Sequence, residues 1–490
     1  MTMHQSIRRL LHEIGLGRMS STAYDTAWVA RLIELGEPIG EHALEWLREH
    51  QLLDGSWGAE ELKYYHDRLV CTLAAMTVLA KYGTRQDHDR IQLAQFALEE
   101  FSRGLEADPA GETIGFEMIV PTLLAEAESL GVVRPGQSHG LSRFSHYRQR
   151  KLASLPHGMI NRFVTVAFSS EMAGPDALRL LDTENLKEKN GSVATSPSAT
   201  AYYVLNVQPG DQAALEYLRG AVADTGGVPN VIPFDVFEQA WTLWNLALAG
   251  LVDDGLLALV QPRLDFLQAA WEPGRGVGHT IFYTPNEGDD TSLTHEVLAR
   301  FGRPMDVEAV LHYEQQDHFR CFDLEANPSI STNVHVLGAL RQAGLEVQHP
   351  SVRKALGFLQ RMQTAGMLWL DKWHTSPYYT TAHVVIACAG YDDALIDDAI
   401  YWILATQSKN GSWGYYVPTA EETAYCLQAL VTWKRNGGQV PSRALKRGRA
   451  WLADHAEPPY PPLWIGKCLY CPELVVRSAI LSALALVTQE

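Results

Sequence analysis

The sequence has few cysteines, and their spacing does not predict a metal centre. Six cysteines occur in 490 residues, and most lie in apolar helical patterns, where cysteine behaves as a small buried residue. The one closely spaced pair, Cys468 and Cys471, has no second pair that could complete a four-ligand set. This argues against a zinc site and leads us to expect a reducing compartment.

Long basic runs and long hydrophobic runs are also missing. The formal net charge is -17 and no basic cluster is longer than Arg148-Gln149-Arg150-Lys151, which argues against nucleic acid as a partner. An anionic ligand stays compatible with this charge, because a local basic site or a metal can hold a phosphate. No apolar run approaches the roughly 20 residues of a membrane span, and residues 1–9 are too polar for a signal peptide. We expect a soluble, cytoplasmic protein, and the sequence does not predict its oligomeric state.

Strand-like alternation is scarce, and helical periodicity takes its place. Apolar residues recur at three- and four-residue spacing along most of the chain, as in Trp241, Trp244 and Leu248. The length suggests two to four domains, and 46% hydrophobic residues supply enough material for large cores. The sequence therefore predicts an almost all-α protein.

One turn occurs twice at nearly full strength. Gln51-Leu52-Leu53-Asp54-Gly55-Ser56-Trp57-Gly58 and Gln407-Ser408-Lys409-Asn410-Gly411-Ser412-Trp413-Gly414 share Gln, Gly, Ser, Trp and Gly at identical offsets, and residues 189–192 are a decayed copy. Asp or Asn followed by Gly forms the turn, and the Trp packs it against a neighbouring helix pair. Such a repeat predicts a closed or stacked array of helix pairs.

This repeat resembles the QW motif of squalene–hopene cyclases and of their relatives, the class II diterpene cyclases. Further segments along nearly the whole chain resemble diterpene cyclase signatures, namely residues 23–30 (AYDTAWVA), 114–121 (IGFEMIVP), 196–201 (SPSATA), 226–230 (GGVPN) and 422–425 (ETAY). Each segment alone is a weak signal, whereas the set together is highly specific.

The resemblance implies two (α/α) barrel domains, β and γ, with γ inserted after the first helix of β. We expect residues 1–34 to be the first segment of β, residues 35–224 to be γ, and residues 225–490 to be the remainder of β. Nothing resembles the class I α domain, because the run from Asp392 to Asp398 has the wrong spacing for a metal-binding DDxxD helix. The resemblance thus implies protonation chemistry only, with a product that keeps its diphosphate for a class I terpene synthase or a phosphatase.

An acidic stretch, Glu287-Gly288-Asp289-Asp290, is the candidate centre of this chemistry. Taken alone, it fits a solvated loop or helix N-terminus, or a buried group of acids in which one carboxyl stays protonated. The resemblance to the family's DxDD motif implies that Asp289 is the general acid and that Asp290 tunes it. Glu287 departs from the motif, and its extra methylene moves the carboxylate by about 1.5 Å, which can cost on the order of 100-fold in rate. Natural variation and an engineered substitution are both compatible with Glu287.

Five further residues are implied by the resemblance to surround the reacting chain. Asn333 and His335 occupy a segment that faces the acid in relatives, so they either hydrogen-bond its carboxyl or form a satisfied buried pair. His279 aligns with a family tryptophan and is a candidate wall residue. Asn230 is retained from a His/Asn pair that ends the reaction in plant relatives, and Phe168 replaces the histidine. Because phenylalanine cannot accept a proton, we expect a rearranged product.

The resemblance also implies a site for the diphosphate and for Mg²⁺. The counterpart of the family's acidic magnesium segment contains Glu106 and Asp108, with Glu112 further on, although a solvated helix end fits these residues equally well. Lys467 is the stronger candidate for a phosphate contact and Lys372 the weaker one.

These features together predict a class II diterpene cyclase that converts geranylgeranyl diphosphate to a bicyclic diterpenyl diphosphate of kolavenyl (clerodane) or halimadane type. The alternatives are a labdane (copalyl) diphosphate synthase, a drimenyl-type sesquiterpene cyclase acting on farnesyl diphosphate, and a triterpene cyclase. The triterpene alternative is disfavoured by the length and by the lack of a membrane-docking helix. A non-enzymatic alternative is a helical-barrel lipid-binding protein with an inactive acid motif, of which Glu287 would be the sign.

Overall fold

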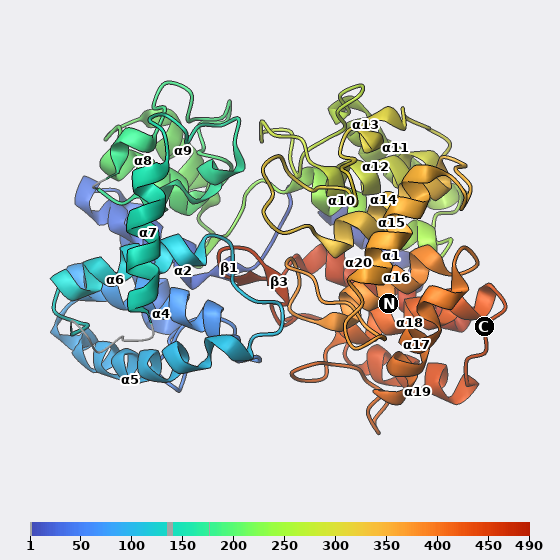
Figure 1. Cartoon of the computed structure of the whole chain (residues 1–490). Helices are drawn as coiled ribbons and strands as arrows, with labels where there is room; N and C mark the ends of the chain where they lie inside the picture. Colours follow the sequence, from blue (N-terminus) through green and yellow to red (C-terminus); the bar gives the residue numbers. More distant parts are fainter. Residues whose placement is uncertain (1, 135–140, 176) are drawn as a thin grey trace.

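The computed structural model describes residues 2–134, 141–175 and 177–490. The described chain folds into two helical lobes that lie side by side (Figure 1), and views from above and below show the same division. Two separate hydrophobic cores correspond to these lobes. We call the lobe formed by α2 to α9 the γ domain, and the lobe formed by α1 and α10 to α20 the β domain.

The γ domain consists of helices with short connections. Its α-helices are α2 (Ala23–Ala30), α3 (Pro38–Glu49), α4 (Tyr65–Tyr82), α5 (His88–Gly104), α6 (Phe116–Ser129), α7 (Ser142–Ser154), α8 (Pro197–Asn206) and α9 (Gln212–Ala221). Its 3₁₀ helices are η1 (Arg31–Leu35), η2 (Arg85–Asp87), η3 (Leu105–Ala107), η4 (Thr165–Ala173) and η5 (Leu178–Leu180).

The β domain contains the remaining helices. They are α1 (Met3–Glu13), α10 (Asp235–Leu248), α11 (Asp254–Ala270), α12 (Gly288–Arg300), α13 (Glu308–Leu311), α14 (Ile330–Gln342), α15 (Pro350–Arg361), α16 (Pro377–Cys388), α17 (Asp393–Ala405), α18 (Ala420–Arg435), α19 (Ser442–Asp454) and α20 (Glu473–Thr488). Four two-residue strands, β1 (Ser21–Thr22), β2 (Val228–Pro229), β3 (Trp464–Ile465) and β4 (Leu469–Tyr470), form two antiparallel pairs between the lobes.

Six helices of the β domain close into a ring. Each of α10, α12, α14, α16, α18 and α20 packs against the next, and α20 packs against α10. The inner helices are buried on all sides, as in α16, where 11 of 12 residues are buried, whereas only 4 of 13 are buried in the outer helix α17. This difference follows from sequence, because a helix that is apolar all round must be enclosed and an amphipathic helix covers it. The predicted all-α fold of (α/α) barrels is confirmed for this domain.

The γ domain has a smaller ring of the same kind. Its inner elements are α2, α4, α6, η4 and α8, and each of these helices except η4 is covered by the helix that follows it in the chain. The 3₁₀ helix η4 therefore occupies a position that an inner α-helix would otherwise fill. Phe168, the residue expected to influence the end of the reaction, lies on this irregular element.

The repeated turns have the same contacts in both domains. The indole N–H of Trp57 donates to Leu47 at 2.7 Å, and that of Trp413 donates to Ile403 at 2.7 Å. A third turn of this type was missed by the sequence analysis. Trp369 stands six residues after Gln363, as in the other two copies, and its indole N–H donates to Leu359 O at 2.7 Å.

The point at which the chain passes from the β core to the γ core differs from the boundary expected at residue 34. Ile14 is part of the β core, whereas Ala23 and all of α2 are part of the γ core. The segment of β before the insertion thus ends before α2 instead of at residue 34. At the other end, Val228 packs in the γ core and Val231 in the β core, close to the expected boundary.

The hairpin of β3 and β4 connects the domains. Although it belongs to the C-terminal half of the chain, its Cys468 packs in the γ core, and the backbone N–H of Leu469 donates to Asp67 of α4 at 2.7 Å. In the described part of the chain, no helix is both long enough and apolar enough to cross a membrane.

Candidate active site

Three carboxyl groups gather where α12 begins. The segment before them is tied to the γ domain, because Thr284 donates through its N–H and its hydroxyl to Glu188 at 3.1 and 2.6 Å. Glu287 is the N-cap of α12, and its carboxylate accepts from the backbone N–H of Asp289 at 2.7 Å and from that of Asp290. A helix N-terminus offers unpaired N–H groups that favour a negative charge. The two interpretations of this stretch, helix N-terminus and buried acid group, thus describe the same residues.

Glu287 and Asp290 are almost completely enclosed, with exposed fractions of 2% and 4%. Burial, assisted by the charge of Asp289, raises the pKa of Glu287 to about 7. Burial and the charge of Glu287 raise the pKa of Asp290 well above its usual range. Two coupled carboxyls in a poorly hydrated site oppose each other's ionisation, because each negative charge destabilises the other.

Asp289 differs from its neighbours in exposure and in its partner. Its side chain keeps 14% of its surface accessible, and its Oδ1 lies 2.5 Å from Nδ1 of His335 on α14. Burial alone would lower the pKa of His335, but the carboxylate of Asp289 outweighs burial and raises it. Of the three carboxyls, Asp289 therefore combines an accessible surface with an imidazole partner.

The two polar residues expected near the acid have different roles. His335 contacts Asp289, as described above. Asn333 does not contact the acid: its carbonyl accepts from Phe319 N at 2.8 Å, and its amide donates to the carbonyls of Phe319 and Ser329 at 2.8 Å each. Asn333 is therefore a satisfied buried residue that holds the loop before α14.

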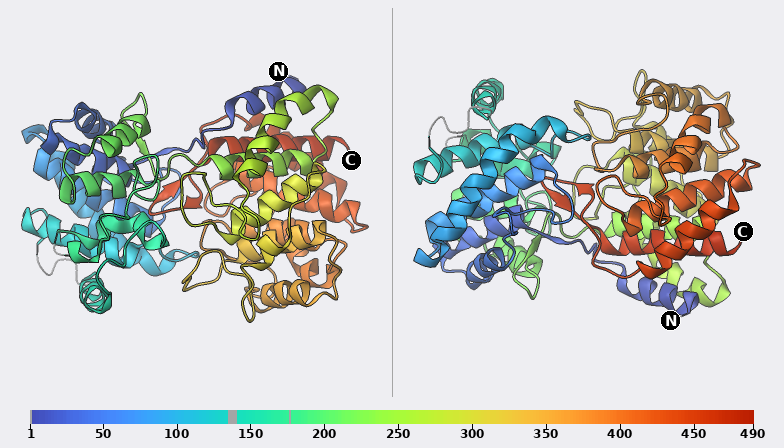
Figure 2. Two further views of the ribbon diagram at one scale, coloured as in Figure 1. Left: turned by 90° about the horizontal axis from the view of Figure 1, so that it is seen from above. Right: turned by 90° about the horizontal axis from the view of Figure 1, so that it is seen from below.

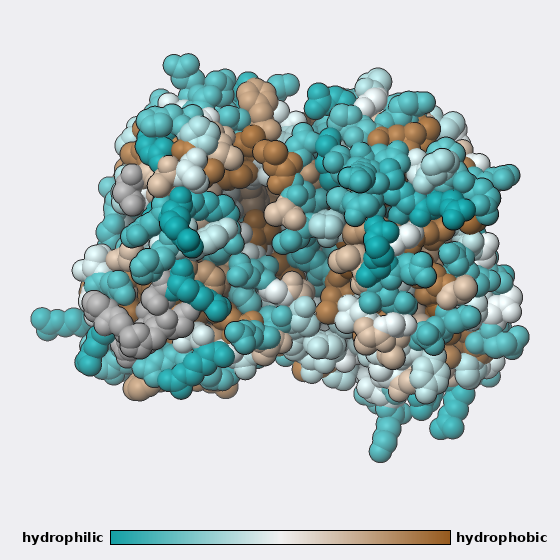
Figure 3. Space-filling model, in the orientation of Figure 1, coloured by the Kyte–Doolittle hydropathy of each residue, from teal (hydrophilic) through white to brown (hydrophobic). Residues whose placement is uncertain are grey.

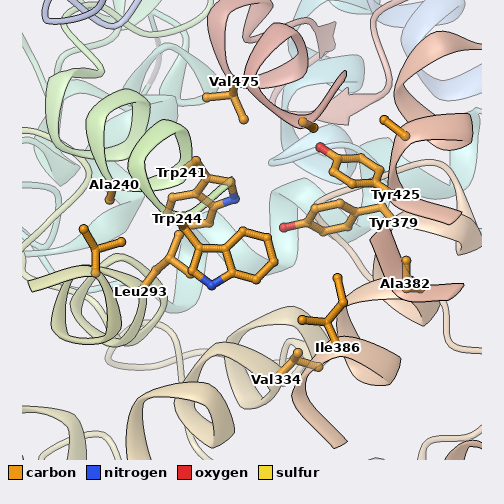
Figure 4. Packing of buried hydrophobic residues seen from close by; sticks show 14 of the residues in the cluster. Ala240, Trp241, Trp244, Leu293, Val334, Tyr379, Ala382, Ile386, Tyr425 and Val475 are labelled. Carbon is orange, nitrogen blue, oxygen red and sulfur yellow. The ribbon is translucent and has the colours of Figure 1, made fainter. Parts of the chain in front are cut away.

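Aromatic side chains from facing helices line the interior of the β barrel. Figure 4 shows Trp241 and Trp244 of α10 opposite Tyr379 of α16 and Tyr425 of α18. The ring of Trp241 lies edge-to-face against His335, with centroids 5.3 Å apart, which places this lining beside the acid. A cation near such ring faces is stabilised by about 0.5–2 kcal/mol per ring. The sequence alone does not distinguish the tryptophans of this lining from the tryptophans that pack the repeated turns.

His279, the expected wall residue, lies between the domains. Its Nε2 is 3.1 Å from the hydroxyl of Thr195 in the γ domain, and its ring packs against Phe234 and Tyr283 with centroid distances of 5.4 and 4.5 Å. Burial lowers the pKa of His279 to about 3. It is a neutral polar wall residue at neutral pH.

Lys467 lies in a buried ionic cluster at the domain interface. Its ammonium group is 2.7 Å from Glu171 and from the hydroxyls of Ser196 and Ser198, and neither charged side chain is more than 1% exposed. The ammonium also lies 4.5 Å from the ring centre of Phe168. In this position Lys467 neutralises Glu171, and its contact with a phosphate stays a prediction.

Asn230 lies beside this cluster and is held by a second buried acid. Its amide donates to Asp25 Oδ2 at 2.8 Å, while its own Oδ1 is buried and has no hydrogen-bond partner among the described residues. Burial raises the pKa of Asp25 even though Lys467 opposes it. Asp25 and Glu171 were not singled out from sequence, because neither lies in a recognisable motif of acids.

The β3–β4 hairpin connects this cluster with the aromatic lining. Trp464 packs edge-to-face on Tyr379 at 4.9 Å, and Lys467 of the same hairpin is in the ionic cluster. Trp464 and Lys467 are three positions apart, and three residues of extended chain span at most about 10 Å, so the two sites lie close together. Phe168 packs against both hydrophobic cores. Figure 3 shows that the surface is hollowed between the two lobes and that hydrophobic residues are visible inside the hollow.

Lys372, the weaker phosphate candidate, supports the acid motif indirectly. It pairs with Glu325, which accepts from the backbone N–H of Cys321 at 2.9 Å. The thiol of Cys321 in turn donates to Glu287 at 2.8 Å. Cys321 is thus a residue of the site that sequence reasoning missed, since a single cysteine in a loop carries no signal.

The residues expected to bind Mg²⁺ do not form a site. Asp108 caps α4: it accepts from the backbone N–H groups of Tyr65 and His66 at 3.0 and 2.8 Å, and its Oδ2 lies 2.7 Å from Nδ1 of His66. Glu106 and Glu112 are exposed. With its oxygens already occupied, Asp108 does not fit as a metal ligand.

One compact group of ligand atoms does occur among the described residues. Asp67, Cys71 and Cys468 are buried, and their ligand atoms lie within 4.8 Å of one another. Two thiols do not suit Mg²⁺, which prefers oxygen ligands. We therefore derive no step of the chemistry through a metal.

Comparison with known proteins places this site in a family. Residues 317–460 match the model of the squalene–hopene cyclase C-terminal domain. The chain is 48% identical to a type B diterpene cyclase of Mycobacterium tuberculosis (strain ATCC 25618 / H37Rv), with 99% of each chain covered. It is 32% identical to an ent-copalyl diphosphate synthase of Streptomyces sp. (strain KO-3988), with coverage of 96% of this chain and 92% of the relative. The solved structure of an ent-copalyl diphosphate synthase from Streptomyces platensis superposes with a TM-score of 0.81 at 29% identity, covering 99% of both chains.

An acid held at the N-terminus of a barrel helix, an aromatic interior and relatives matched along nearly their whole length lead to the same conclusion. The chain belongs to the class II diterpene cyclases of the squalene–hopene cyclase superfamily. It is an enzyme of the isomerase type.

Proposed function

We propose that the enzyme cyclises geranylgeranyl diphosphate to a rearranged bicyclic diterpenyl diphosphate of kolavenyl or halimadane type. The observation that carries the proposal is the environment of Asp289, which is the one acid of the motif with an accessible surface and an imidazole partner. The aromatic lining next to it suits a hydrocarbon chain that becomes positively charged.

The first step is a proton transfer. Asp289 gives its proton to the less substituted carbon of the terminal alkene, whose π electrons form the new C–H bond and leave a tertiary cation on the neighbouring carbon. Two further alkenes attack in turn, each forming one C–C bond, so that two rings close and the positive charge moves along the chain. The diphosphate takes no part in these bond changes and remains in the product.

The aromatic rings that line the barrel interior keep the cation from water. Trp241 and Trp244 offer ring faces on one side, and Tyr379 and Tyr425 face them from the other. A dry interior lined by polarizable rings lengthens the life of the cation, because water would otherwise capture it.

The end of the reaction decides the skeleton. Phe168 cannot accept a proton, and the carboxylate of Glu171 behind it is engaged by Lys467. With no strong base at this point, hydride and methyl groups can migrate before a proton is lost. Asn230 keeps a buried oxygen without a hydrogen-bond partner among the described residues, and this oxygen can bind a water molecule. The water then serves as the weak base that ends the reaction.

Product analysis tests the proposal. Incubation of the purified enzyme with geranylgeranyl diphosphate, followed by dephosphorylation and gas chromatography–mass spectrometry, should give a bicyclic diterpene alcohol. A parallel incubation with farnesyl diphosphate should give little product, and the opposite preference would favour the sesquiterpene alternative. Absence of product from both substrates would support the lipid-binding alternative.

The skeleton has a test of its own. Phe168→His should shift the product toward a copalyl-type skeleton, because an imidazole at this position restores a base early in the cascade. Phe168→Tyr, of nearly the same size, controls for packing. An unchanged product profile in Phe168→His would refute the role given to Phe168 and leave the protonation step untouched.

A further inference from the structure

The acid is followed by two imidazoles in a row. Asp289 Oδ1 lies 2.5 Å from Nδ1 of His335, and Nε2 of His335 lies 3.0 Å from Nδ1 of His383 on α16. Both histidines are only 2% exposed. This line of three side chains joins the inner helices α12, α14 and α16.

The geometry restricts where protons can be. A protonated His335 donates through Nδ1–H to Asp289 and through Nε2–H to His383, whose Nδ1 must then be an acceptor. In that state the remaining N–H of His383 is on Nε2, which has no hydrogen-bond partner among the described residues. The ring of His383 stacks on Trp244, with centroids 5.0 Å apart and planes at 22°, so that it cannot turn away easily.

The surroundings favour a charge on His335 and not on His383. Burial, with His335 and His374 nearby, lowers the pKa of His383 well below its usual range. The titratable groups that face the two imidazoles are Asp289 and Glu296 of α12, Asp371 and His374 of the segment before α16, Tyr379 of α16, and Tyr425 of α18. Of these, Asp289 is the group that contacts His335 directly.

We propose that His383 is a positioning residue for the proton transfer: its Nδ1 accepts from the Nε2–H of His335, so that Nδ1 of His335 faces the carboxyl of Asp289 and the pair holds the proton that starts the reaction. The inference rests on the proposed function for its catalytic consequence. Its structural part concerns only the free enzyme.

Asp289 and His335 share one proton across their 2.5 Å contact. This proton leaves for the alkene through Asp289, and the π electrons of the alkene form the new C–H bond. After the product has lost its own proton, the carboxylate of Asp289 is reprotonated and the pair is restored. His383 gains and loses no proton in this cycle and acts only as an acceptor.

Two variants separate the hydrogen-bond acceptor of His383 from the packing of its ring. His383→Phe keeps an aromatic ring against Trp244 and removes the acceptor. His383→Asn places an amide oxygen near the position of Nδ1 and restores the acceptor with a smaller side chain. Thermal unfolding of each variant shows whether the barrel has formed. If one variant is too unstable to study, the other is still compared with the wild type.

The first measurement uses the free enzyme. Histidines are labelled with ¹³C at Cε1, the signal of His335 is identified by its loss in His335→Asn, and its titration is followed by NMR. The pKa of His335 should fall by about one unit in His383→Phe, the scale of one hydrogen bond to a charged group, and should return toward the wild-type value in His383→Asn.

The second measurement is the pH profile of kcat with geranylgeranyl diphosphate. The rate should fall at high pH where the pair loses a proton, and this limb should move down by about one pH unit in His383→Phe, with KM changed less than twofold. An unchanged limb and an unchanged titration in His383→Phe, or a His383→Asn variant that behaves like His383→Phe, would overturn the inference. If no product forms from this substrate, the proposed function fails and the titration still decides the role of His383.

Discussion

Replacement of Glu287 by glutamine tests the electrostatics of the acid motif. Glu287 accepts from two backbone N–H groups and one thiol, and burial raises its pKa from 4.5 to about 7. Glutamine offers one carbonyl oxygen in place of two carboxyl oxygens. Loss of one hydrogen bond should make the variant about 1 kcal/mol less stable at pH 4.5 to 5, where Glu287 of the folded wild type is protonated.

The pH dependence gives the sharper result. A folded-state pKa above the unfolded value contributes stability below pH 4.5 that is lost as the pH rises to about 7. A shift of 2.5 units corresponds to about 3 kcal/mol. Because glutamine does not ionise, the wild type should lose this free energy relative to the variant. The variant should therefore become about 2 kcal/mol more stable than the wild type at pH 8.

Urea unfolding of both proteins between pH 4.5 and 8.5, followed by tryptophan fluorescence, measures this difference. Comparison at each pH cancels the titration of those groups that Glu287 does not influence. Glu106→Gln removes the same chemical group from an exposed position and serves as the matched control. A difference between Glu287→Gln and the wild type that stays constant with pH would refute the reasoning.

Three more changes follow from the contacts. Lys467→Met leaves the buried carboxylate of Glu171 without its partner. The variant should be about 3–5 kcal/mol less stable than the wild type in a denaturation curve. Added diphosphate should not restore this stability. Trp369→Ala should destabilise the β domain by about 3–5 kcal/mol, as Trp413→Ala should, if the third turn is equivalent to the others; a cost below 1 kcal/mol would contradict this. Asp108→Asn weakens the cap of α4 and should lower the unfolding temperature whether or not Mg²⁺ is present. A loss seen only with Mg²⁺ would instead identify Asp108 as a metal ligand.

Sequence predicted those parts of the fold that depend on local patterns. The turns at Trp57 and Trp413 carry Gly and Ser at fixed offsets and were found, whereas Trp369 follows Ala365-Gly366-Met367-Leu368 and was missed. The first boundary was placed too late, because α2 is apolar on all sides and its pattern does not reveal which of two cores it joins.

Sequence predicts a candidate site residue where a motif singles it out, and Asp289 is such a candidate through the acid motif. The partner of an acid, in contrast, depends on how α12 and α14 pack. Asn333 and His335, two residues apart, were therefore not separable by sequence. Lys467 looked free in sequence, since its partner Glu171 lies 296 positions away. Long-range pairing of this kind leaves no mark in a local pattern.

The central claim is that the carboxyl of Asp289 supplies the proton that starts cyclisation. Incubation with geranylgeranyl diphosphate in D₂O, after the enzyme has exchanged, tests it most directly. In the wild type, deuterium should enter at the carbon that was the less substituted carbon of the terminal alkene. Asp289→Asn, folded as judged by its unfolding temperature, should give no product. Labelled product formed by Asp289→Asn at the wild-type rate would contradict the account.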